Sequence, residues 1–595
     1  MTGLTDLDLG IEALRTAYQT GKLTCSDMIA EVLRRLEAAG DDRVWISRCA
    51  DPALRATAAT LDKARAADPS TLDRLPLFGV PFAIKDNIDL EGVDTTAACP
   101  GFAYRPGQSA QVVAALVAAG AIPIGKTNLD QFATGLVGVR SPYGVPRNPF
   151  DAAYVPGGSS SGSAVAVAAG LVSFALGTDT AGSGRVPAGF NNIVGLKPTP
   201  GRVPTAGVVP ACRSLDCVSV FALSCADAAS VFQVLAPAVP GPALGATFRF
   251  GVLRAEDRAF FGDAASEAIY DRSIQRMIEL GGTPHPFDYA PFRDAAQLLY
   301  SGPWVAERTA AVGRFIESAD ASAGVWPTTR DIVMGGKRFS AVDAFEGQYR
   351  LAELAPRATR ERAGLDFLLL PTSGTIYRVA DLEREPVLFN SNLGHYTNFV
   401  NFFGLAALAL PAGFRPDGLP VGVTLVGEAD SEAALLALGD RWQRATALPL
   451  GRTSSRLPTA PLPPPAEDRV EIVVVGAHMS GLPLNGQLVD LGGRLERAGH
   501  TAPEYRFFVL PGGPPQRPGL VRVAEGGARI AHEVWSLPAE QVGALLRKIP
   551  APLGLGQVRL DDGTSVSGFL CEAIATQDAR DITALGGWRA FLATG

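Results

Sequence analysis

The chain has 595 residues, 47% of them hydrophobic, which is enough for two or more domains with large cores. The net charge of −7 is spread along the chain without long runs of one sign, which argues against a nucleic-acid partner. The seven cysteines are an odd number and form no CxxC pair, so neither a disulfide framework nor a metal site is predicted.

The first residues do not combine a basic segment with an apolar stretch, and no apolar run reaches about 18 residues. These features predict neither a signal peptide nor a membrane span. Together with the cysteine pattern they lead us to expect a soluble protein of the reducing cytoplasm, without a membrane partner.

The N-terminal segment is predicted to be helical. Residues 7–39 are expected to form two helices joined at residues 20–22. The second helix has Thr24 or Ser26 as a plausible N-cap and Gly40 as its stop.

Residues 120–127, GAIPIGKT, match the phosphate-cradling loop of NTPases. That loop needs a strand before its first glycine and a helix after its lysine. Here a helix is predicted over residues 111–119, and residues 121–124 are predicted to form a strand inside the loop. We therefore reject the NTPase interpretation.

Two serine-containing turns dominate the middle of the chain: residues 157–163, GGSSSGS, and residues 177–188, GTDTAGSGRVPA. Glycine permits backbone angles closed to other residues, so each turn is expected to present hydroxyl and N–H groups. The small-residue run over 164–177 is predicted to be the buried element between them.

A serine hydroxyl is a poor nucleophile unless a base takes its proton. Lys85 is the better candidate for that base, because it ends an apolar, strand-like run, and burial lowers the pKa of a lysine. Histidine would be the usual choice, but none lies near either serine turn in sequence: the five are at 285, 395, 478, 500 and 532.

Lys85 and the two serine turns, in this order, resemble the amidase signature enzymes. The resemblance implies Ser183 as acyl nucleophile, Ser159 as a proton-relaying serine after a non-proline cis peptide, and Lys85 as the ultimate base. It also implies an oxyanion hole made by the N–H groups of Thr180, Ala181, Gly182 and Ser183. Many members of that family have Gly where this chain has Ala181; the methyl group should narrow the site without disabling it.

After the serine turns, short strands and helices alternate, as in residues 246–282. This alternation, together with the resemblance, predicts an α/β fold of the amidase signature type, with a mixed β-sheet covered by helices on both faces. The polar segment 390–401 is expected to support the site, with His395 in a structural role.

Residues 298–308 contain Tyr300 and Arg308, with Ser301 as a possible cap and Pro303 in the first turn of a helix. This segment is similar to the allophanate hydrolase branch of the family, in which the matching Tyr and Arg hold the substrate carboxylate. An arginine fork suits a carboxylate through two charge-assisted hydrogen bonds. The alternative is a solvated helix arginine and a core tyrosine.

The predicted domains are a catalytic domain over residues 1–455, a stiff, unpacked proline-rich linker over 456–469 and a tail over 470–595. The tail reads as a small strand-rich domain with a possible hairpin through residues 561–563. It resembles the allophanate hydrolase C-terminal domain, which is related to γ-glutamyl cyclotransferase-like barrels. That domain has been assigned a role in decarboxylating the amidase product or in assembly, and His478 is its candidate catalytic residue.

The resemblance implies an allophanate hydrolase that forms ammonia and CO₂ by way of N-carboxycarbamate, with no metal or cofactor. It also implies a homodimer and, as a possible partner, a urea carboxylase or an enzyme of cyanurate or biuret breakdown. Two alternatives stay open: an amidase of other specificity, and a tail that serves only in assembly. An amidotransferase subunit would leave the tail unexplained.

Overall fold

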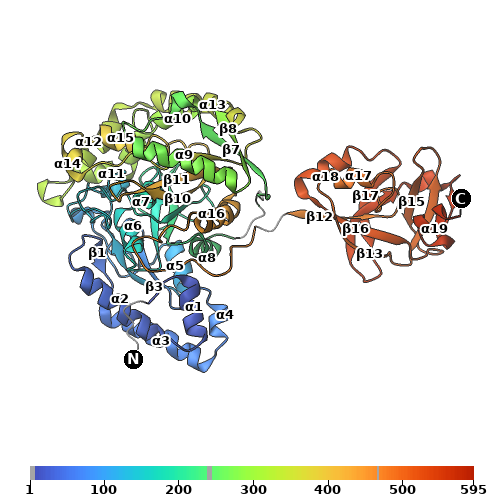
Figure 1. Cartoon of the computed structure of the whole chain (residues 1–595), viewed down its shortest axis with the longest axis horizontal. Helices are drawn as coiled ribbons and strands as arrows, with labels where there is room; N and C mark the ends of the chain where they lie inside the picture. The colour runs from blue at the N-terminus through green and yellow to red at the C-terminus, as the bar shows by residue number, and fades with distance from the viewer. Residues whose placement is uncertain (1–6, 238–240, 242–243, 465–467, 595) are drawn as a thin grey trace. The chain divides into compact units, whose positions relative to one another are not determined.

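The structure is a computed structural model that describes residues 7–237, 241, 244–464 and 468–594. The chain divides into two compact units, Met1–Pro465 and Ala466–Gly595 (Figure 1). This division falls inside the predicted linker.

A mixed sheet of eleven strands forms the centre of the first unit, in the order β1-β3-β2-β4-β6-β5-β10-β11-β9-β7-β8. The strands are β1 (Trp45–Arg48), β2 (Pro81–Lys85), β3 (Ile122–Thr127), β4 (Phe174–Asp179), β5 (Val194–Lys197), β6 (Cys217–Ala222), β7 (Phe248–Leu253), β8 (Gly282–Phe287), β9 (Phe367–Pro371), β10 (Ala406–Phe414) and β11 (Pro420–Gly427). Strand β2 runs parallel to both β3 and β4, so these three strands end at the same edge of the sheet.

Helices cover both faces of this sheet, as the sequence predicts. Phe82 and Ile84 of β2 belong to one apolar cluster and Ala83 to another, since neighbouring strand residues point to opposite faces. Figure 1 shows α9, α10 and α13 beside β7 and β8. The helices are α1 (Ile11–Gln19), α2 (Cys25–Ala39), α3 (Asp51–Ala67), α4 (Thr71–Arg74), α5 (Gln111–Ala118), α6 (Ser161–Ala168), α7 (Val186–Phe190), α8 (Cys225–Leu235), α9 (Ala264–Glu279), α10 (Ala290–Gln297), α11 (Val305–Ser318), α12 (Pro327–Gly335), α13 (Ala341–Arg362), α14 (Val379–Arg384), α15 (Leu388–Leu393) and α16 (Glu432–Thr446).

The two predicted N-terminal helices are confirmed as α1 and α2. Thr24 caps α2: its hydroxyl accepts a hydrogen bond from the Asp27 N–H, and the Asp27 carboxylate accepts one from the Thr24 N–H. Helix α2 ends at Gly40, whose φ of +61° favours glycine.

The rejection of the NTPase loop is confirmed. Lys126 lies inside β3, where its Nζ is 3.1 Å from Asp86 Oδ1 and both side chains are fully buried. A lysine paired in this way does not face a phosphate site.

Three local predictions are wrong. Residues 164–177 form the end of α6 and the start of β4 and not one element. Helix α11 begins after Trp304 without a side-chain cap, so Ser301 does not cap it, although Arg308 does lie on this helix. The linker is packed over its first half, because Leu457 and Leu462 contact the two large apolar clusters.

The second unit is rich in strands, as predicted. A five-stranded sheet has the order β13-β16-β12-β18-β17 and a three-stranded sheet has the order β15-β14-β19. The predicted hairpin joins β17 and β18, which pair from Arg559 with Ser565. The elements are β12 (Arg469–Val474), α17 (Asn485–Val489), β13 (Arg494–His500), β14 (Tyr505–Leu510), β15 (Arg517–Arg522), β16 (Ala531–Pro538), α18 (Ala539–Leu546), β17 (Leu553–Arg559), β18 (Ser565–Cys571), β19 (Arg580–Asp581) and α19 (Trp588–Leu592).

Among the residues that the structure describes, no helix combines the length and the apolar character needed to cross a bilayer. The seven cysteines are free thiols.

Candidate active site

Lys85 is the last residue of β2, and its side chain is fully buried. Its Nζ lies 2.8 Å from Ser159 Oγ and 2.7 Å from Thr178 Oγ1. Thr178 belongs to β4, which runs parallel to β2, and Ser159 precedes α6. The peptide bond between Gly158 and Ser159 is cis, as the resemblance implies. The structure thus places the predicted base against the predicted relay serine.

Burial lowers the pKa of Lys85 from 10.5 to about 7. The carboxylates of Asp130, Asp179 and Asp216 oppose this shift, and the positive charge of Arg308 adds to it. A substantial fraction of Lys85 is therefore neutral near pH 7, as a general base requires.

Asp179 organises the turn that carries Ser183. Its carboxylate accepts hydrogen bonds from the Gly182 N–H (2.8 Å), the Gly184 N–H (3.0 Å) and Arg185 Nε (2.8 Å). Burial alone would raise the pKa of Asp179, but the equally buried Arg185 guanidinium, together with Lys197 and the Gly184 N–H, outweighs burial and lowers it. The turn is therefore built around a buried charged pair, a role that the sequence analysis did not assign to Asp179.

This hydrogen bonding corrects one member of the predicted oxyanion hole. The Gly182 N–H donates to Asp179 and is not available to a substrate oxygen in this conformation. Gly182 has a φ of +137°, and a Cβ there would lie 2.3 Å from Thr397 Oγ1, so glycine is required for the turn itself. The N–H groups of Thr180, Ala181 and Ser183 remain as candidates.

Ser183 itself is only 3% exposed. It follows β4 within the turn held by Asp179, and Thr178 of the same strand contacts Lys85. The two serine turns and the lysine therefore share one edge of the sheet.

The polar segment 390–401 supports the serine turn, as predicted. Thr397 Oγ1 donates to the Ala181 carbonyl at 2.7 Å, and Asn401 Nδ2 donates to the Asp179 carbonyl at 2.9 Å. His395 instead packs against the rings of Tyr289 and Tyr396. Burial lowers the pKa of His395 to about 4, so this imidazole is neutral.

Arg308 is buried, with 1% of its surface exposed, so the alternative of a solvated arginine is wrong. Its Nη1 donates to Thr134 Oγ1 at 3.1 Å and to the Ala133 carbonyl at 3.3 Å. Its Nη2 is 3.3 Å from the Tyr300 hydroxyl, and its Cζ lies 5.2 Å from the centroid of that ring.

Within the described part of the chain, Arg308 Nε is buried without a hydrogen-bond partner. Tyr300 packs against the apolar cluster that contains Ala181, which places the Tyr300–Arg308 pair beside the serine turn. An unpaired cationic donor at this position is suited to an anionic group of a small ligand.

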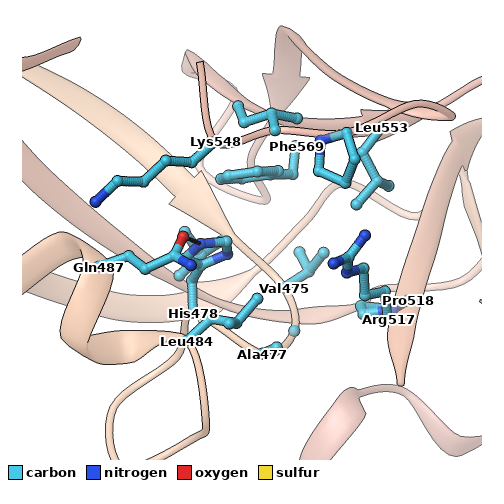
Figure 2. A pocket seen from close by; sticks show the side chains of 14 residues that line it. Val475, Ala477, His478, Leu484, Gln487, Arg517, Pro518, Lys548, Leu553 and Phe569 are labelled. Atoms are coloured by element: carbon cyan, nitrogen blue, oxygen red, sulfur yellow. Dashed lines mark hydrogen bonds between the residues drawn. The ribbon is translucent and has the colours of Figure 1, made fainter. Parts of the chain in front are cut away.

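His478 lines a cavity of about 60 Å³ in the second unit (Figure 2). Its ring stacks on Phe569 with centroids 4.9 Å apart, and its Nε2 lies 3.2 Å from Gln487 Oε1. An amide oxygen only accepts, so Nε2 is the donor in the tautomer that forms this hydrogen bond. Burial lowers the pKa of His478.

Two cations also line this cavity. Figure 2 shows Arg517 and Lys548 on different sides of the His478 ring. The sequence analysis singled out His478 but missed Gln487, Arg517 and Lys548, because these residues come from separate elements. The cavity is suited to a small anion next to an imidazole.

The mixed sheet and the buried lysine beside the serine turns define an amidohydrolase. The chain belongs to the amidase family, which it matches over residues 27–436, and residues 470–593 match the allophanate hydrolase C-terminal domain. Both matches confirm the resemblance drawn from the sequence.

Relatives extend this assignment. The chain is 42% identical to the urea amidolyase of Saccharomyces cerevisiae over 87% of its own length but only 30% of that protein. It thus spans about a third of the length of the urea amidolyases that it matches. The Kluyveromyces lactis allophanate hydrolase structure is 38% identical, with a TM-score of 0.77 over 98% of this chain and 99% of that one. A glutamyl-tRNA(Gln) amidotransferase subunit from a Synechococcus species is 33% identical over 76% of this chain and 99% of that protein.

Replacing Lys85 with Met tests the lowered pKa without an activity assay. The unfolded chain binds the Lys85 proton more tightly than the native one, so the native state gains stability from this site as pH rises from about 7 towards 10.5. The free energy of unfolding of the wild type, measured relative to Lys85→Met, should therefore rise over this range by up to about 1.4 kcal/mol per pH unit. Denaturant titrations at several pH values give this difference, and a constant difference would show that the lysine keeps its ordinary pKa.

Proposed function

We propose that this protein hydrolyses allophanate, urea-1-carboxylate, to ammonia and N-carboxycarbamate, which then loses CO₂. The observation that carries the proposal is the buried Arg308 beside the serine turn, whose Nε has no hydrogen-bond partner among the residues that the structure describes. An amidase that acts on neutral amides has no need for a desolvated cation there. The likeness to the Kluyveromyces lactis allophanate hydrolase along nearly the whole of both chains supports it.

In the proposed reaction Ser183 Oγ attacks the terminal amide carbonyl of allophanate. Its proton passes through Ser159 to neutral Lys85, whose Nζ already lies 2.8 Å from Ser159 Oγ. The N–H groups of Thr180, Ala181 and Ser183 stabilise the oxyanion. The relay then returns the proton to the departing nitrogen, ammonia leaves, and water hydrolyses the acyl-enzyme with Lys85 again as base.

Arg308 and Tyr300 bind the carboxylate of allophanate in this proposal. The guanidinium supplies the positive charge that pairs with the carboxylate, and Lys85 supplies the base. The repulsion between the two cations also helps to lower the pKa of Lys85. The substrate anion and the neutral base thus have separate places in the site.

The second unit offers a site for the product. N-Carboxycarbamate carries two carboxylates, and the cavity at His478 is lined by Arg517 and Lys548. A bound dianion would raise the proton affinity of His478, which could then protonate the nitrogen as the bond to CO₂ breaks. This role favours decarboxylation over a purely assembling tail.

Two alternatives are weaker. An amidase of other specificity would share the serine and lysine chemistry but would leave the buried Arg308 unexplained. The amidotransferase subunit relatives match 76% of this chain or less, which leaves the second unit without a counterpart. Among the predicted partners, the urea amidolyase relatives favour an enzyme that supplies allophanate from urea over one of cyanurate or biuret breakdown.

Replacing Ser183 with Ala should abolish ammonia release from allophanate, because no other hydroxyl takes its place in the turn. Ser219→Ala is the matched control: its hydroxyl is buried and unpaired within the described residues and lies next to Gly184. The control should retain activity. Ammonia release by Ser183→Ala at a rate near that of the wild type would exclude Ser183 as the nucleophile.

Replacing Arg308 with Gln should raise KM for allophanate at least about tenfold, because a charge-assisted pair is lost. The rate with a neutral amide such as biuret, measured well above pH 7 so that Lys85 is neutral with or without the Arg308 charge, should change little. Arg314→Gln, on the exposed side of the same helix, serves as control and should leave both substrates unaffected. Equal losses for allophanate and biuret would contradict the carboxylate clamp.

Replacing His478 with Ala should leave the first ammonia release unchanged and slow the appearance of CO₂, if the second unit acts on the product. His500→Ala, an exposed histidine in the same unit, is the control. A stopped-flow ammonia assay and a CO₂ electrode follow the two steps separately. Unchanged CO₂ release would favour a tail that serves only in assembly.

A further inference from the structure

Asp216 lies directly before β6 and contacts the turn that carries Ser183. Its Oδ1 accepts a hydrogen bond from Thr180 Oγ1 at 2.5 Å. Thr180 directly follows β4 and offers one of the N–H groups that remain candidates for the oxyanion hole. Strands β4 and β6 are antiparallel, and the last residue of β4, Asp179, pairs with the first residue of β6, Cys217. The register of these two strands therefore brings Asp216 opposite Thr180.

The Asp216 carboxylate accepts hydrogen bonds on both of its oxygens. The Ala211 N–H donates to Oδ2 at 2.9 Å, and the Cys212 N–H lies 3.1 Å from Oδ1 and 3.2 Å from Oδ2. Burial raises the pKa of Asp216, and these donors, the Thr180 hydroxyl and the charge of Arg308 oppose that rise. Because a backbone N–H can only donate, the hydrogen bonds favour the ionised carboxylate.

The loop that carries Asp216 is fixed on both sides. The Leu215 carbonyl accepts a hydrogen bond from Asn401 Nδ2 at 2.8 Å, and the same nitrogen donates to the carbonyl at the end of β4. The Ser214 N–H donates to Glu307 Oε2 of α11 at 2.9 Å. Since its backbone is held in this way, Asp216 can keep a partner in place.

The charges that act on Lys85 come from four separate segments. They are Asp130, which follows β3, Asp179 of β4, Asp216 and, with opposite sign, Arg308 of α11. The negative charge of Asp216 raises the pKa of Lys85, whereas burial and Arg308 lower it. Asp216 therefore stabilises the ammonium that forms when Lys85 takes up a proton.

The surroundings leave the charge of Asp216 available for this purpose. Asp179 is neutralised by Arg185 in a buried ion pair, whereas the donors to Asp216 are a hydroxyl and two N–H groups. The charge of Asp216 also acts on the thiols of Cys212 and Cys217, but burial raises the pKa of both, so they stay neutral.

We infer that Asp216 is a positioning residue for amide hydrolysis. Its carboxylate holds Thr180 so that the N–H of this residue stays in the oxyanion hole, and its negative charge favours the proton that Lys85 accepts from the serine relay. The inference rests on the proposed roles of Thr180 and Lys85.

Replacing Asp216 with Asn removes the charge and keeps the size of the side chain. The rise of kcat/KM for allophanate with pH should move to lower pH by at least about half a pH unit, because the Lys85 ammonium loses a stabilising charge. On the plateau above about pH 8, kcat should fall at least about tenfold. KM should not rise, since Arg308 keeps its charge. D216S removes the same charge with a smaller side chain and should move the profile in the same direction.

Replacing Thr180 with Val separates the two effects. This variant loses the hydroxyl but keeps the N–H and the charge of Asp216, so kcat should fall while the pH profile keeps its wild-type position.

The matched control is D227N, because Asp227 is a buried carboxylate that accepts from Ser224 Oγ and from the Ile11 N–H. The six residues of β6, about 20 Å of strand, lie between Asp216 and this site. D227N should leave both kcat and the pH profile unchanged.

The outcomes distinguish this inference from the proposed function. A wild-type profile that rises near pH 7 and that neither D216N nor D216S moves would overturn the role of the Asp216 charge and leave Lys85 as the base. An unchanged kcat in T180V would overturn the positioning of Thr180. A wild type without the rise would overturn Lys85 as the base, and this inference with it. Circular dichroism of each variant shows that its fold is retained.

Discussion

The arrangement of charges in the first unit is built around the buried contact between Lys85 Nζ and Ser159 Oγ. A lysine can serve as a base only if nothing nearby holds its proton. The three carboxylates that act on Lys85 are each engaged elsewhere: Asp130 accepts from the Arg140 N–H, Asp179 from Arg185, and Asp216 from Thr180. Their charges are thus shared with other donors, and burial prevails in the pKa of Lys85.

The same division of charge would let one small site hold both the base and the substrate anion that we propose. Arg308 contacts Thr134 and Tyr300, and its Nε has no partner in the described part of the chain. Lys85 instead contacts two hydroxyls, which can hydrogen-bond to it with or without its extra proton. The serine turn is held by hydrogen bonds to the Asp179 carboxylate, and by hydrogen bonds from the side chains of Thr397 and Asn401 to its backbone carbonyls. Backbone N–H donors in a turn held in this way can stabilise a negative charge that develops on a substrate oxygen, because the turn need not rearrange first.

The elements that the sequence predicts well are those set by local chemistry. The cap at Thr24, the stop at Gly40 and the strand ending at Lys85 follow from side chains within a few positions of each other. The sequence predicts poorly those features that depend on contacts between residues far apart in the chain. Arg308 is buried because Ala133 and Thr134, far away in sequence, accept its hydrogen bonds. Likewise, the Gly182 N–H donates to Asp179 because of the conformation of the turn, which a sequence motif does not specify.

The pH dependence of kcat/KM for allophanate tests the central claim, a neutral buried lysine that drives amide hydrolysis through a serine. The free enzyme should gain activity as pH rises through about 7, the pKa of Lys85, with a slope of one proton. A value of kcat/KM that stays constant from about pH 5.5 to 9 would show that no group of this pKa is the base, and would contradict the account.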